Sequence, residues 1–213
     1  MKEKGDLQEA VKVAVTGLAA EPEHFKLNRL AGGLYFDLSQ HQEALSFYEK
    51  ALAKKKKDAE SLLGAGMSAY HVGSYEQAIE FFDRGIKTKK KKGEFLYGLG
   101  LAQTEMENYA EADLNLRKAI DKDKKNARYH LALGEVNYRN SVFSIAISEF
   151  YKAIEFDSTL DRSIEDLHYK MAKAYIQMRN VEKAIEEYRK DLDLHPEDTT
   201  AWLELAKICK VSD

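Results

Sequence analysis

The stretch AESLLGAGMSAYHVGSYEQAIEFFDRGI, residues 59–86, holds two apolar patterns of helical spacing, each with a small residue near its middle. These small residues are Gly66 in the first pattern and Ala78 in the second, twelve positions later. Aligning the chain on this alanine gives steps of 34 residues, except for a last step of 38, at Ala10, Ala44, Ala78, Ala112, Ala146 and Ala184. A fixed period of this length indicates stacked copies of one two-part unit.

The small residue of the first pattern also recurs, always twelve residues before the matching alanine: Gly32, Gly66, Gly100, Gly134 and Ala172, with Ala206 repeating it once more. A glycine inside an exposed helix costs about 1 kcal/mol relative to alanine. We therefore expect two helices that approach closely, the glycine of the first helix meeting the alanine of the second. A ligand-binding glycine loop is the alternative, but neither a P-loop nor a strand-flanked G-x-G-x-x-G occurs.

This pattern resembles the tetratricopeptide repeat (TPR), whose 34-residue signature is W-x2-L-G-x2-Y, then A-x3-F, then P. The large residue after the alanine is Tyr48, Phe82, Leu116, Phe150 or Tyr188. The signature Trp appears only as Trp202, and the terminal Pro only as Pro22 and Pro196. The resemblance covers almost the whole chain and implies an all-α, right-handed superhelical solenoid of helix-turn-helix repeats.

The period divides residues 1–213 of a single array as follows: a second helix alone at 1–24, repeats at 25–58, 59–92, 93–126, 127–160 and 161–198, and a first helix alone at 199–213. The repeat at 161–198 carries four extra residues, about one helical turn. Either they lengthen its first helix or they lengthen a loop. Ser163 with Asp166 is a candidate capping box, and Ser158 or Asp161 a candidate cap for an earlier start.

The amino-acid composition argues against several classes of protein. With 33 Lys and Arg against 36 Asp and Glu, the chain is mildly acidic, which argues against a main role in neutralising phosphates. The single Cys209 excludes an internal disulfide and favours a cytoplasmic location, although a fragment of a protein located elsewhere also fits. We expect no signal peptide and no membrane-spanning helix, because charged residues interrupt every apolar stretch.

The chain shows no catalytic or metal-binding pattern. Its six histidines have no i,i+4 pairing and no carboxylate or cysteine at metal-ligand spacing, so we expect no enzyme activity, no cofactor and no metal. His130 and His168 share the fourth repeat position, where packing between helices is the expected role. Cys209 aligns with Tyr35 and Tyr175 and is expected to be a packing residue rather than a nucleophile.

The resemblance implies a concave groove lined by the second, fifth, ninth, twelfth and thirteenth positions of each repeat, among them Lys26, Gly33, Asp37 and Glu60. The candidate residues for binding a peptide or helix of another protein are Arg29, Phe36, Leu63, Met67, Tyr70, Tyr97, Leu101, Leu131, Tyr138, Arg139, Tyr169 and Ile176. No three consecutive repeats carry the Lys, Asn and Arg pattern by which some TPR co-chaperones bind a chaperone's acidic C-terminus. A carboxylate clamp is therefore disfavoured.

Lysines cluster where one repeat meets the next. These residues, which we call the basic edge, are Lys54, Lys55, Lys56, Lys57, Lys89, Lys90, Lys91, Lys92, Lys122, Lys124 and Lys125. One interpretation is that they keep the turns soluble and complement the helix macrodipole, worth about 0.3–1 kcal/mol each. The other is a basic ridge that binds an acidic partner or nucleic acid, although the overall acidity makes nucleic acid unlikely.

The terminal half repeats predict a further contact. Trp202, Leu205, Ala206 and Cys209 recur at helical spacing, and no second helix follows them in this sequence. We expect self-association, or a helix from a partner, to cover this surface.

Overall fold

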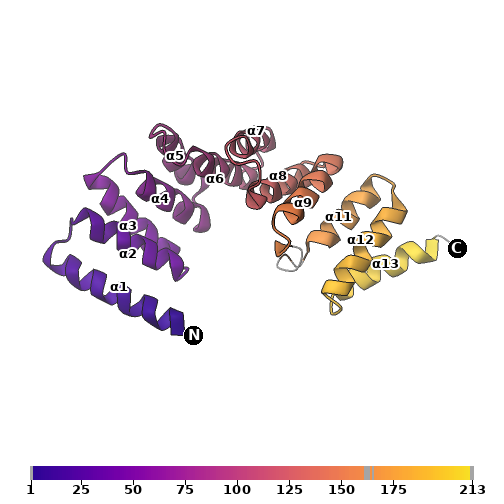
Figure 1. Ribbon diagram of the computed structural model, residues 1–213, viewed down its shortest axis with the longest axis horizontal. Coiled ribbons are helices and arrows are strands. Elements are labelled where there is room, and N and C mark those ends of the chain that lie inside the picture. Colours follow the sequence, from indigo (N-terminus) through magenta and orange to yellow (C-terminus); the bar gives the residue numbers. More distant parts are fainter. Residues whose placement is uncertain (1, 161–163, 165, 212–213) are drawn as a thin grey trace. The chain divides into compact units, whose positions relative to one another are not determined.

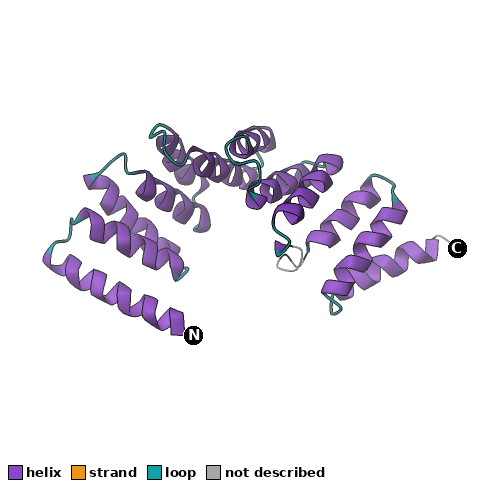
Figure 2. Cartoon of the chain, in the orientation of Figure 1, coloured by secondary structure: helices purple, strands orange, loops and turns teal. Residues whose placement is uncertain are grey.

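The computed structural model describes residues 2–160, 164 and 166–211, and these form twelve helices and no strand (Figure 1). Apart from the connection between Phe156 and Leu167, short turns join the helices (Figure 2). The chain divides into two compact units, Met1–Lys122 and Asp123–Asp213, each of which is described by itself. The all-α prediction is confirmed for this part of the chain.

Unit 1 consists of an initial helix followed by three antiparallel hairpins. Its helices are α1 (Lys2–Ala20), α2 (Phe25–Asp37), α3 (His41–Lys54), α4 (Ala59–His71), α5 (Tyr75–Ile86), α6 (Lys92–Glu105) and α7 (Tyr109–Ile120). The hairpin partners are α2 with α3, α4 with α5, and α6 with α7. Each hairpin therefore corresponds to one 34-residue period of the sequence.

Each hairpin turn contains one residue with a left-handed backbone. In unit 1 these residues are Ser39 (φ 60°), Gly73 (φ 81°) and Glu107 (φ 61°). The residue after each one donates its backbone N–H to a carbonyl in the last turn of the first helix, for example Gln40 to Tyr35 at 2.9 Å. This bonding closes the helix end in the manner of a Schellman motif. The turn geometry thus repeats even where the residue is not glycine.

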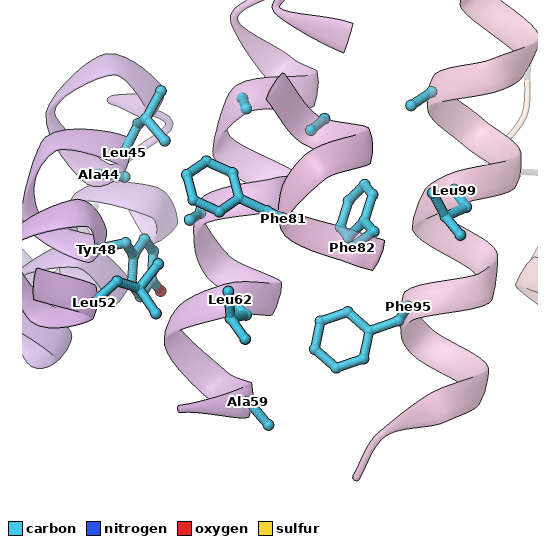
Figure 3. Packing of buried hydrophobic residues seen from close by; sticks show 14 residues of the cluster. Ala44, Leu45, Tyr48, Leu52, Ala59, Leu62, Phe81, Phe82, Phe95 and Leu99 are labelled. Carbon is cyan, nitrogen blue, oxygen red and sulfur yellow. The ribbon is translucent and has the colours of Figure 1, made fainter. Parts of the chain in front are cut away.

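The core of unit 1 lies between the first and second helices of successive hairpins, where Tyr48, Leu62, Phe81, Phe82 and Phe95 pack together (Figure 3). The repeated glycines lie against this core. A Cβ atom added to Gly66 would lie 2.4 Å from Cε1 of Phe82, so no larger residue fits without movement.

The expected glycine–alanine contact needs a correction. The nearest atoms to Gly32, Gly66 and Gly100 belong to the large side chain one turn after the alanine, because this side chain lies directly over the glycine. Only Gly134 also has an atom of the alanine, the Ala146 carbonyl oxygen, among its nearest neighbours. The glycine makes room for a large side chain rather than for the alanine.

Unit 2 consists of two hairpins and a final helix: α8 (Ala127–Arg139), α9 (Phe143–Phe156), α11 (Leu167–Gln177), α12 (Val181–Leu194) and α13 (Thr199–Val211). Its hairpin turns carry the same left-handed residue, at Ser141 (φ 61°) and Arg179 (φ 58°). The core contains Phe150 between the two hairpins and Tyr188 beneath α13.

The described helix after the four extra residues is not lengthened. Helix α11 has 11 residues, against 13 for α8, and its N-cap Asp166 makes no side-chain capping bond. Ser158 lies in a turn before it. Asp161 and Ser163 fall outside the described residues.

Candidate peptide-binding surfaces

The predicted groove residues of unit 1 lie between core and solvent. Phe36, Leu63, Met67 and Tyr70 are half-buried and pack against the edge of the hydrophobic core. Tyr97 and Leu101 of α6 are also half-buried. These side chains therefore present part of their apolar surface while their inner parts are held in place, which restricts their rotamers before a ligand binds.

A hollow of about 290 Å³ opens on this surface between α2 and α4. Its lining includes Lys26, Arg29, Gly33 and Asp37, which occupy groove positions of the first full repeat, and Glu60 of the next repeat. Arg29 forms an ion pair with Glu60 at 2.6 Å. The hollow is thus lined by both signs of charge around the backbone of Gly33.

Aromatic rings extend the unit 1 surface beyond this hollow. The imidazole rings of His41 and His71 stack at 4.4 Å, and Phe36 contacts both rings edge-on at 5.0 and 5.6 Å. Burial, and to a lesser extent the neighbouring His41, lowers the pKa of His71. Phe36, His41 and His71 thus form one cluster of contacting rings.

Unit 2 has its own half-buried apolar surface, formed by Leu131, Tyr138, Tyr169 and Ile176. Tyr169 packs edge-on against the buried Tyr188 at 5.7 Å between ring centroids. Burial raises the pKa values of Tyr138 and Tyr169, so both phenols stay neutral at physiological pH.

Charged residues surround the unit 2 surface. Arg139 donates to Glu135 within α8 at 3.0 Å, and Lys170 of α11 reaches the same carboxylate at 3.0 Å. Arg139 and Arg29 were both predicted to take part in ligand binding, and both are already engaged with a carboxylate of the chain. A ligand carboxylate would compete with these ion pairs.

The basic edge is exposed along the described turns, but its placement on the helices differs in one respect from the prediction. Lys54 ends α3, whereas Lys92 begins α6, at the helix end where a positive charge is unfavourable. In unit 1 a second hollow, of about 410 Å³, brings Lys57 together with Lys87, Lys90 and Lys91. Lys87 was not predicted as part of this edge.

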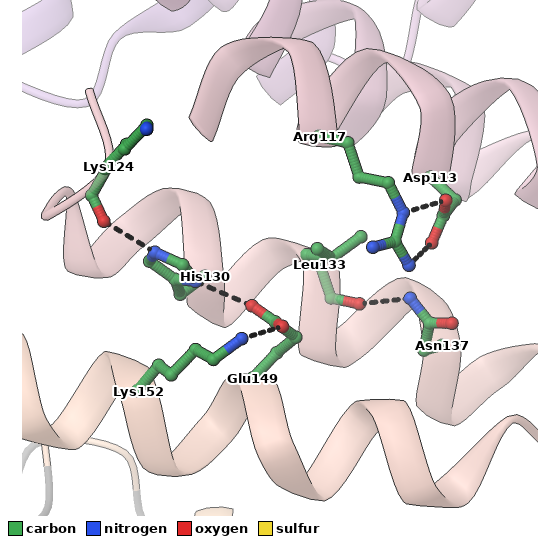
Figure 4. Close-up of polar contacts among 8 residues, drawn as sticks. All are labelled: Asp113, Arg117, Lys124, His130, Leu133, Asn137, Glu149 and Lys152. Carbon is green, nitrogen blue, oxygen red and sulfur yellow. Dashed lines mark hydrogen bonds and ion pairs between the residues drawn. The ribbon is translucent and has the colours of Figure 1, made fainter. Parts of the chain in front are cut away.

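Two His–Glu–Lys clusters, in which the histidine and the glutamate are buried and the lysine is exposed, occupy equivalent places in the hairpins of unit 2. In α8–α9, His130 Nδ1 lies 2.6 Å from Glu149, which also accepts from Lys152 at 2.7 Å (Figure 4). The other ring nitrogen of His130 lies 3.0 Å from the Lys124 carbonyl oxygen. Both ring nitrogens of His130 therefore lie within hydrogen-bond distance of an oxygen atom.

The second cluster, in α11–α12, is larger. Glu187 is 1% exposed and lies 2.7 Å from His168, Lys190 and Tyr151. Burial raises the pKa of Glu187, but these three hydrogen bonds outweigh burial and lower the pKa to about 2. The expected packing role of both histidines is confirmed, while their glutamate partners were missed. The 19-residue spacing common to both pairs was the available signal.

Two terminal residues differ from expectation. Cys209, expected to be a packing residue, is exposed, because among the described residues no second helix packs on α13 as α3 packs on Tyr35 and α12 on Tyr175. Leu205, expected to be uncovered, is 9% exposed and packs against α12. Trp202 is 53% exposed in the single chain, and its coverage by a second chain stays a prediction.

The described residues contain neither a candidate metal site nor a candidate membrane-spanning helix. Among the described residues, no group of three or more His, Cys, Asp or Glu side chains is arranged to hold a metal ion. Within the same part of the chain, no helix is both long enough and apolar enough to cross a lipid bilayer.

These helical hairpins, with half-buried side chains on their first helices, define a class of repeat proteins that act as interaction scaffolds. A tetratricopeptide repeat family model matches residues 2–59, 48–94 and 97–160, and a second such model matches 165–208. The chain therefore belongs to the tetratricopeptide repeat family. A search of curated protein sequences gave no match.

Several solved structures have a similar fold. YrrB, described as a TPR protein with an unusual peptide-binding site, is 22% identical with a TM-score of 0.69, covering 91% of this chain and 98% of YrrB. MamA from Desulfovibrio magneticus RS-1 is 20% identical with a TM-score of 0.70, covering 82% and 97%. Cut9, in the APC/C Cut9–Hcn1 hetero-tetramer, is 17% identical with a TM-score of 0.76, covering 99% and 40%. At these identities the similarity shows the fold alone.

Proposed function

We propose that this protein is a non-catalytic scaffold that binds a peptide or helix of a partner protein on the groove surfaces of its first helices. The observation that carries the proposal is the 290 Å³ hollow, because Lys26, Arg29, Gly33, Asp37 and Glu60 line it from positions that the repeat pattern selects. A concave site with a few convergent polar groups is the usual form of a ligand site. The single cysteine favours a reducing compartment for this role.

Half-buried aromatic residues give these surfaces their binding capacity. Tyr97 and Tyr169 share one repeat position, in unit 1 and unit 2 respectively, and Leu63 and Leu131 occupy the same position in neighbouring repeats. Aromatic side chains that are already held by packing lose little conformational entropy on binding, and tyrosine is enriched among binding hot spots. YrrB, whose described function includes peptide binding, provides a precedent for this class of ligand.

The proposal is tested by selecting binders from a displayed peptide library and measuring their affinity by fluorescence anisotropy. Replacing Tyr97 or Tyr169 with Ala should weaken peptides bound at the corresponding unit by about 2 kcal/mol or more if these residues are hot spots. Circular dichroism should show unchanged helicity. Peptides whose affinity is insensitive to both substitutions would contradict the groove assignment.

The 410 Å³ basic hollow supports a second candidate function, the binding of an acidic partner at the basic edge of unit 1. Four lysines, Lys57, Lys87, Lys90 and Lys91, line this hollow against the carboxylates of Asp58 and Glu60. Replacing Lys89–Lys92 with Ser should leave groove-bound peptides almost unaffected. If this variant alone loses the selected peptides, and binding falls steeply with salt, the basic edge is the site.

A further inference from the structure

Helix α13 exposes the face that every complete hairpin buries under its second helix. We call this the hairpin face and define it by the fourth, eighth and eleventh residues of a first helix, which are Trp202, Ala206 and Cys209 in α13. At the fourth position, Leu62 is 0%, Leu96 is 4% and Trp202 is 53% exposed. Ala206 and Cys209 are exposed as well. α13 packs instead on α12, through Ala201 and Leu205.

Helix α1 exposes the complementary face. It is a second helix by its repeat pattern, and it buries Ala14 and Leu18 against α2, the first helix of the next hairpin. Val13 on its other side is 65% exposed. The residues equivalent to Val13 in complete hairpins, such as Phe81 and Glu187, are 5% and 1% exposed, because their own first helix covers them.

We infer that two copies of this chain associate head to tail, with the hairpin face of α13 in one copy packing against α1 of the next to complete a hairpin. The five complete hairpins supply the template for this interface. Tyr35, at the eleventh position of α2, stacks on Phe47 of α3 with 5.2 Å between ring centroids. Phe47 occupies the same repeat position as Val13 of α1. The same arrangement places Cys209 and Trp202 of one copy beside Val13 of the other.

The chemistry of the two faces agrees with this pairing. Where α11–α12 pairs His168 with Glu187, the junction would pair Trp202 with Val13, so both partners are apolar and no charge is buried. The Trp202 indole N–H already donates to the Pro196 carbonyl oxygen at 3.0 Å, which leaves the ring face free of unmet polar groups. Ala206 keeps a small residue at the eighth repeat position, and Ala10 keeps the alanine that is fully buried in every complete hairpin.

A matched control lies on the same helix. Leu203 is 56% exposed, nearly the same as Trp202, but it occupies the fifth repeat position and so belongs to the groove surface instead of the hairpin face. Replacing Leu203 with Arg should leave the association intact. Replacing Ala206 with Arg should abolish it, because a long side chain cannot fit at the helix crossing.

The test is sedimentation velocity of the full chain over a wide concentration range, with reductant present to prevent disulfides at Cys209. The unmodified chain should form species larger than a dimer, or a closed ring, since a head-to-tail interface is heterologous. Ala206→Arg and Val13→Arg should each be monomeric alone. Mixed together they should form a 1:1 complex and nothing larger, because each retains the one face that the other lacks.

Three results would overturn the inference. The first is an unmodified chain that stays monomeric at every concentration. The second is a Val13→Arg variant that still dimerises alone, which would indicate a symmetric contact between two α13 helices. The third is a Leu203→Arg variant that disrupts association as strongly as Ala206→Arg. Trp202→Arg provides a second block of the same face should Ala206→Arg lose helicity.

Discussion

The hairpins α4–α5 and α11–α12 fill the same two repeat positions with opposite kinds of side chain. In unit 1 the pair is Leu62 and Phe81, 0% and 5% exposed within one hydrophobic cluster. In unit 2 it is His168 and Glu187, 4% and 1% exposed and 2.7 Å apart. The hairpin therefore accepts either hydrocarbon or a buried ion pair at this point, provided that every polar atom finds a partner.

The largest effect should come from breaking the buried pair in unit 2. Replacing Glu187 with Leu leaves His168 buried without its acceptor and should destabilise unit 2 by about 3–5 kcal/mol. Introducing the residue pair of unit 1, with His168→Leu and Glu187→Phe together, should recover most of the lost stability. Amide hydrogen exchange measures the local stability of unit 2 in both variants. A local measurement is needed because repeat arrays need not unfold in one step. A double variant as unstable as the single one would show that the two hairpins are not interchangeable.

Acid should weaken unit 2 through the same carboxylate. The pKa of Glu187 is lowered to about 2, below its ordinary value of 4.5, so its contribution is present above pH 4.5 and is lost as the pH falls toward 2. The full contribution is about 3 kcal/mol. Protection factors of the α12 amides, which correct for the intrinsic pH dependence of exchange, should be lower at pH 3 than at pH 5.

A Glu187→Gln variant isolates this contribution from that of Asp191 in the same helix. Burial raises the pKa of Asp191, so Asp191 acts in the opposite direction and disfavours the folded state as the pH rises. The α4–α5 hairpin, with its apolar pair, should show the smaller change. Equal acid sensitivity in Glu187→Gln and the unmodified chain would remove Glu187 as the cause.

The smallest effect concerns the eighth repeat position, which is Gly66 in α4 and Ala172 in α11. Gly66→Ala places a Cβ atom 2.4 Å from the Phe82 ring and should destabilise unit 1 by about 1–2 kcal/mol, despite the better helix propensity of alanine. Gly33→Ala is the matched control in α2. Its nearest atom would be at 3.6 Å, so it should stabilise unit 1 by up to about 1 kcal/mol. Similar changes in urea midpoint for both would contradict the packing explanation.

The repeat positions predicted some features of the candidate groove and missed others. They place Leu63 and Tyr169 at half-buried positions, because a repeat position determines which side of a helix faces its neighbours, and the role of these residues in binding stays a prediction. They did not predict that Arg29 pairs with Glu60. An ion pair between hairpins depends on the distance between two first helices, and the residue spacing within each helix does not predict that distance.

The helical repeats could be predicted from the sequence, because a 34-residue recurrence of small and large residues is typical of stacked helix pairs. The sequence did not reveal which distant residues come together in the folded chain, such as the hydrogen-bonded pair His130 and Glu149, or Lys57 and Lys90, which line one hollow. Only the tertiary structure decided that Ser39, Glu107, Ser141 and Arg179 adopt a left-handed backbone where glycine would be usual. The physical reason is that helix propensity and periodicity act locally, whereas packing of a whole hairpin can impose a strained turn of about 1–2 kcal/mol and bring distant side chains together.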